Sequence, residues 1–60
     1  EGRWLTGWKE IASYLGVHVK TAQRYAKELG MPVYSVGYIK ARTDEIDAWI
    51  MGRKKYGKED

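Results

Sequence analysis

Residues 8–25 read WKEIASYLGVHVKTAQRY, and the apolar positions in this stretch predict two short helices joined by a tight turn. The first helix is indicated by residues at i, i+3, i+4 and i+7, which share one helical face: Trp8, Ile11, Ala12 and Leu15. We expect Gly7 to be its N-cap, with Thr6 as the alternative, and Glu10 to reach back to the cap amide. Gly16 ends the helix, because glycine adopts the left-handed conformation at low cost.

A second helix is expected from about Val19 to Leu29, where Gly30 and Pro32 stop it. Its inward face is predicted to hold Ala22, Tyr25, Ala26 and Leu29. Its opposite face holds Lys20, Gln23, Arg24 and Lys27. The turn over residues 16–18 is short, and the small side chain of Ala12 lets the helices approach closely. This spacing is typical of a helix-turn-helix.

The chain after the two helices predicts a hairpin and a third helix. Residues 33–42 are rich in β-branched and aromatic side chains, and Gly37-Tyr38 suits a two-residue type II′ turn. Thr43 is expected to cap the third helix, which Gly52 ends. Its inward side chains are predicted to be Ile46, Trp49 and Ile50. We therefore expect a mainly α fold with a small β-hairpin, a winged helix-turn-helix over residues 5–52, followed by a basic, flexible tail over residues 53–60.

The large apolar side chains of so short a chain are expected to build its core. Leu5, Trp8, Ile46 and Trp49 are assigned to that core. Trp4 has two interpretations, as a cover for the core edge or as an anchor for a partner segment. Sixty residues suffice for one domain. Because the sequence starts at Glu1, we expect it to belong to a longer protein that has other domains.

Composition argues against several functional classes. With no cysteine and a single histidine, His18, neither a disulfide framework nor a metal site is expected. The carboxylates Asp44, Glu45 and Asp47 fit the N-terminal turn of a helix better than acid-base chemistry, and no nucleophile has a plausible base. We therefore expect no enzyme activity and no cofactor. No apolar stretch approaches the length of a membrane span, so we expect a cytoplasmic location without membrane contact.

The charge distribution favours a polyanionic partner. The chain has a formal net charge of +3, and lysines and arginines outnumber acidic residues five to one over residues 18–42. Such a basic segment on a small domain is typical of proteins that bind phosphate backbones. RNA is not expected, because the sequence shows no aromatic platform on a sheet that could stack unpaired bases.

Four segments together resemble the excisionase and MerR-type family of winged helix-turn-helix domains. They are WKEIASYLGV at 8–17, KTAQRY at 20–25, VG at 36–37 and DAWI at 47–50. The resemblance implies duplex DNA binding, with the second helix in the major groove and the wing against the backbone or minor groove. It implies groove positions for Lys20, Thr21, Gln23 and Arg24, a phosphate contact for Lys27, and wing contacts for Lys40 and Arg42. His18 stands where the family often has a capping Ser or Thr, so a capping or phosphate-binding role is expected for it.

These patterns predict sequence-preferring binding of double-stranded DNA, in transcriptional regulation or in site-specific recombination or excision. Arg24 suits guanine and Gln23 suits adenine, because each side chain can form two hydrogen bonds with that base edge. We expect a nucleoid-associated bacterial or phage protein that gains affinity from a homodimer or from adjacent sites. The alternative is a protein-interaction adaptor that docks an acidic partner on Lys20 and Arg24.

Overall fold

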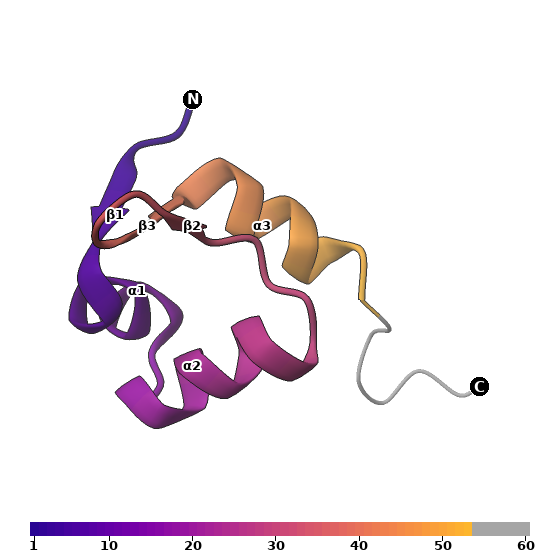
Figure 1. Ribbon diagram of the computed structural model, residues 1–60. Coiled ribbons are helices and arrows are strands. Elements are labelled where there is room, and N and C mark those ends of the chain that lie inside the picture. Colours follow the sequence, from indigo (N-terminus) through magenta and orange to yellow (C-terminus); the bar gives the residue numbers. More distant parts are fainter. Residues whose placement is uncertain (54–60) are drawn as a thin grey trace.

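The computed structural model describes residues 1–53, which form three helices and one antiparallel sheet of three strands (Figure 1). In chain order the elements are β1 (Trp4–Thr6), α1 (Gly7–Leu15), α2 (Val19–Glu28), β2 (Tyr34–Ser35), β3 (Ile39–Arg42) and α3 (Thr43–Met51). The three predicted helices and the predicted hairpin are all present. The prediction for residues 54–60 lies outside the described residues. Within residues 1–53, no helix combines the length and apolar character needed to cross a bilayer.

The sheet has the strand order β1-β3-β2, so β3 is its central strand. In the antiparallel register, Leu5 pairs with Ala41 in one ladder and Tyr34 pairs with Lys40 in the other. Because side chains alternate along a strand, Leu5 and Ala41 face the core while Lys40 faces outward. The strand β1 was not predicted, since three residues are too few to show an alternating pattern. The predicted two-stranded wing is therefore part of a three-stranded sheet.

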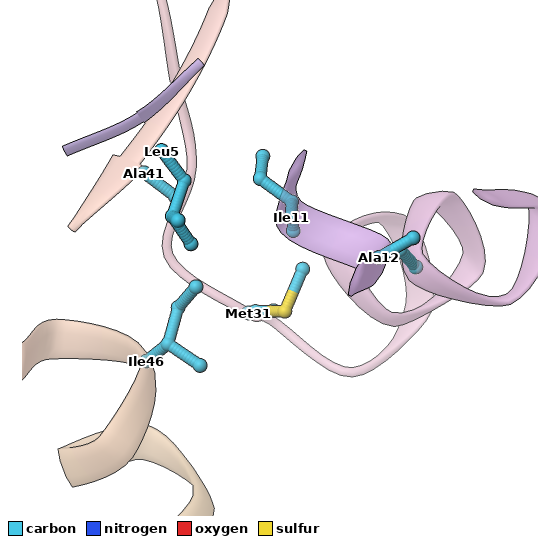
Figure 2. Packing of buried hydrophobic residues seen from close by; sticks show 7 residues of the cluster. Leu5, Ile11, Ala12, Met31, Ala41 and Ile46 are labelled. Carbon is cyan, nitrogen blue, oxygen red and sulfur yellow. The ribbon is translucent and has the colours of Figure 1, made fainter. Parts of the chain in front are cut away.

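Side chains from the three helices, from β1 and β3 and from the segment after α2 meet in one core (Figure 2). Its buried members are Leu5, Ile11, Ala12, Ala22, Met31, Ala41 and Ile46. Leu5 and Ile46 were predicted there, and Trp8 and Trp49 lie partly buried against the cluster. Met31 was missed because it lies between elements, where no periodicity marks a residue as buried.

Two residues predicted to point inward are instead exposed. Leu29 is 40% exposed, because α2 ends at Glu28 and Leu29 occupies the C-cap. Ile50 is 45% exposed, because Ile46 and Trp49 provide the inward contacts of α3. The buried sides of α2 and α3 are therefore narrower than the apolar spacing in the sequence indicated.

The turn after α1 is as predicted, whereas the hairpin turn is one residue longer than predicted. Gly16 has a left-handed backbone (φ 76°), and its N–H donates to the carbonyl of Ala12, as expected for the end of α1. The hairpin turn spans residues 36–38 rather than two residues, because Ser35 and Ile39 form the last pair of the ladder. Gly37 supplies the positive φ that this turn requires (87°).

The N-caps of α1 and α3 differ from the first choices of the sequence analysis. The N-cap of α1 is Thr6, the predicted alternative to Gly7, and its backbone N–H donates to Glu10 Oε1 over 2.7 Å, so the expected contact of Glu10 with the cap amide is present. The N-cap of α3 is Arg42, not Thr43. Thr43 is the buried first residue of α3, and its Oγ1 accepts a hydrogen bond from the Arg3 amide over 3.0 Å. The hydroxyl thus ties the chain before β1 to α3 instead of capping its own helix.

Candidate nucleic-acid interface

The exposed face of α2 carries the predicted groove residues. Lys20, Gln23, Arg24 and Lys27 are all exposed, whereas Thr21 is partly buried beside them. Their spacing of three and four residues places them on one side of the helix, and Ala22 on the opposite side is fully buried. Together with Glu28 they line a shallow depression on the surface. The burial of Ala22 therefore fixes which side of α2 faces solvent.

The cations on this face have no carboxylate partner among residues 1–53. The ion pair found in this part of the chain joins Arg42 to Asp44 and leaves out Lys20, Arg24 and Lys27. These side chains can therefore meet an external anion without first breaking an internal contact.

His18 occupies the N-cap position of α2 with an extended backbone (φ −73°, ψ 156°). Its imidazole makes no capping hydrogen bond, so the expected side-chain cap is not formed. Instead, the His18 carbonyl accepts the first helical hydrogen bond, from the Ala22 amide over 3.0 Å. The imidazole is exposed beside the N-terminal turn of α2.

Lys40 and Arg42 lie on the outward face of the central strand β3, which Figure 1 shows well apart from α2. Arg42 binds Asp44 through two hydrogen bonds, Nε to Oδ1 over 3.1 Å and Nη2 to Oδ2 over 3.3 Å. These bonds lower the pKa of the Asp44 carboxyl and raise the pKa of Arg42. Arg42, for which a wing contact was predicted, is therefore already bound to a carboxylate of the same chain. The turn over residues 36–38 carries no charged residue.

The carboxylates of α3 are engaged separately rather than as a cluster. Besides Asp44, Glu45 accepts hydrogen bonds from the Tyr34 hydroxyl over 2.9 and 3.1 Å, and Asp47 accepts one from Tyr14 over 2.6 Å. Each bond favours the neutral phenol, which raises the pKa of both tyrosines. Within residues 1–53, no three His, Cys, Asp or Glu side chains lie close enough together to hold a metal ion.

A group of aromatic residues that was not predicted lies on the outward sheet face. Trp4 from β1 packs against Tyr34 from β2, and the Lys40 side chain lies close to the rings of Trp4 and of Tyr38 from the hairpin turn. The expectation of no aromatic platform on a sheet was wrong. The residues come from three segments, so only the strand register could have shown that they meet.

Comparisons with protein-family models, with curated proteins and with solved structures find no match to this chain. The resemblance to excisionase and MerR-type domains therefore stays a prediction that rests on the quoted motifs.

Proposed function

We propose that this chain is a winged helix-turn-helix module that binds double-stranded DNA and lays α2 in the major groove. One observation carries the proposal: Lys20, Gln23, Arg24 and Lys27 share the exposed face of α2, and the cations among them lack a carboxylate partner within residues 1–53. A helix fits the major groove of B-form DNA, where the base edges carry a distinct pattern of donors and acceptors. Positive side chains along the same face favour the phosphates on either side.

Each side chain has a role that follows from its chemistry. Arg24 donates two hydrogen bonds to guanine O6 and N7, and Gln23 pairs with adenine through its amide. Lys20 and Lys27 bind phosphates and so fix the register of the helix without reading sequence. Thr21 is partly buried and lies at the edge of the same face.

A module of this size covers roughly 600–1,000 Å² on DNA, which supports modest affinity for a monomer. Binding beside a second copy on adjacent sites raises the effective affinity. The module serves transcriptional regulation or site-specific recombination, and no step of this function requires a cofactor.

The test compares Arg24→Ala with Lys27→Ala on a preferred duplex, selected from a random library, and on a scrambled duplex. Arg24→Ala should lose about 1–3 kcal/mol on the preferred duplex and less on the scrambled one. Lys27→Ala should weaken both duplexes equally and reduce the slope of log K against log salt by about 1. Lys9→Ala, which removes an exposed charge from α1, is the matched control and should change neither affinity appreciably.

Two results would reject the proposal. Equal losses on both duplexes for Arg24→Ala would remove the argument for base readout. An acidic peptide that competes with duplex DNA at similar affinity would favour the adaptor that docks on Lys20 and Arg24.

A further inference from the structure

The outward face of the sheet exposes three large aromatic side chains. Trp4 is 43%, Tyr34 44% and Tyr38 50% exposed. Small monomeric domains rarely gather large apolar side chains on one open surface without a partner. The aromatic sheet face, defined as Trp4, Tyr34, Tyr38 and Lys40, therefore calls for a functional explanation.

Internal packing accounts for only part of this surface. The rings of Trp4 and Tyr34 meet edge to face, with centroids 5.8 Å apart and planes at 75°. The Tyr34 hydroxyl is held by Glu45, so Tyr34 positions Trp4 from one side. Tyr38 has no aromatic neighbour of this kind among residues 1–53, and it lies in a turn whose geometry depends on Gly37. Its ring therefore remains available for an external contact.

Cationic side chains lie close to these rings. The Lys40 Nζ lies 4.5 Å from the centroid of Trp4 and 5.8 Å from that of Tyr38, and the Arg42 guanidinium carbon lies 5.3 Å from the centroid of Trp4. Within residues 1–53 no carboxylate pairs with Lys40, whereas the neighbouring Arg42 is paired with Asp44. The surface thus combines flat aromatic rings with one unpaired positive charge.

We propose that the aromatic sheet face binds single-stranded nucleic acid, with unpaired bases stacked on Trp4 and Tyr38 and a backbone phosphate bound by Lys40. Stacked aromatic rings beside positive side chains are the combination by which proteins hold single strands without reading their sequence. An acidic peptide would satisfy Lys40 but would leave the rings without a planar partner. This surface is separate from α2, so the inference goes beyond groove binding by α2 and does not depend on it, although it includes Lys40, for which the resemblance implies a wing contact.

The test titrates the 60-residue chain at low salt with oligothymidylate and follows the indole and backbone N–H signals by NMR. The Trp4 indole and the Tyr38 amide should shift, while the indole of Trp49, which donates to the Leu29 carbonyl, should not. An abasic deoxyribose-phosphate strand of the same length keeps the charges and lacks the bases. It should bind at least about fivefold more weakly, since each stacked base contributes about fivefold to hundredfold.

Variants at Tyr38 separate stacking from charge without touching the core. Tyr38→Leu should weaken oligothymidylate binding by about fivefold or more, and Tyr38→Phe, which keeps the ring, should bind like the parent. Trp4→Leu should give a similar loss, and backbone spectra of the free variants verify that each remains folded. An oligouridylate of the same length compares RNA with DNA. Binding of either strand at this face supports the inference, and the tighter one identifies the source of the bases.

Three outcomes overturn the inference. The first is equal affinity for the abasic strand or for an acidic peptide, because stacking would then contribute nothing. The second is unchanged affinity in Tyr38→Leu. The third is a loss in Arg24→Ala as large as that in Tyr38→Leu, which would place the single strand on α2. In that last case duplex binding by α2 still stands, and a failure of duplex binding leaves the sheet face untouched.

Discussion

Gly16 joins α1 to α2, and replacing it with alanine should destabilise the domain by an amount set by its backbone conformation. Its φ of 76° lies in the left-handed region, which costs a residue with a Cβ roughly 1–2 kcal/mol. A Cβ built on Gly16 would meet no heavy atom within 4 Å beyond the adjoining backbone, so contacts with the rest of the fold add nothing to that cost. For a chain of 60 residues the whole stability is about 3–9 kcal/mol, so the loss is a large fraction.

Thermal unfolding followed by circular dichroism measures this effect. A loss of that size should lower the Tm by about 4–16 °C. Gly16→Asn should lower it less than Gly16→Ala, because asparagine enters the left-handed region more readily.

Gly52→Ala is the matched control at the end of another helix. Gly52 has a right-handed backbone (φ −82°), and its Cβ would stand at an ordinary contact distance of 3.5 Å from the Ala48 carbonyl oxygen. It should gain about 0.4–1 kcal/mol, because alanine restricts the unfolded chain. If Gly16→Ala and Gly52→Ala change the Tm equally, the argument that a left-handed glycine ends α1 is refuted.

Three further changes test the packing and the charges. Thr43→Val removes the buried acceptor of a backbone amide and should cost about 1–3 kcal/mol in urea unfolding, whereas Thr43→Ser should keep most of that stability. Ala12→Leu should cost about 1–3 kcal/mol in urea unfolding, because it overpacks a buried site. Ser13→Leu, at an exposed position of the same helix, should cost little, and equal losses in the two variants would contradict the overpacking argument. The hydrogen bonds from Arg42 lower the pKa of the Asp44 carboxyl. The stability that this ion pair contributes is therefore fully present above the ordinary carboxyl pKa, and it is lost as the pH falls through the lowered pKa of Asp44. NMR titration of Asp44 should show that low midpoint, and Arg42→Gln should raise it; an unchanged midpoint would rule out the contact.

The local patterns in the sequence were sufficient for the helices. Apolar spacing around Ile11 and Ile46 predicted α1 and α3, and both side chains are fully buried. Gly16 marked the end of α1, because its conformational freedom is a property of the residue itself. The exposed face of α2 followed from the same periodicity once Ala22 was assigned inward.

Contacts between distant segments were not visible in those patterns. Met31 is buried although no repeat includes it, and β1 forms only because β3 supplies its hydrogen-bonding partner. Thr43 is a residue type that often caps helices, but its hydroxyl instead accepts a hydrogen bond from the Arg3 amide, forty residues away in the chain. Competition between a local and a distant partner cannot be judged from neighbouring residues alone.

The candidate surfaces divide in the same way. The exposed face of α2 could be predicted from local spacing, because residues three and four apart on a helix share a side whatever surrounds them. The pairing of Arg42 with Asp44, and the meeting of Trp4, Tyr38 and Lys40 on one sheet face, depend on the folded arrangement of the whole chain. Helical periodicity is local and acts within a few residues, whereas the register of strands far apart in the chain is settled by how the whole core packs.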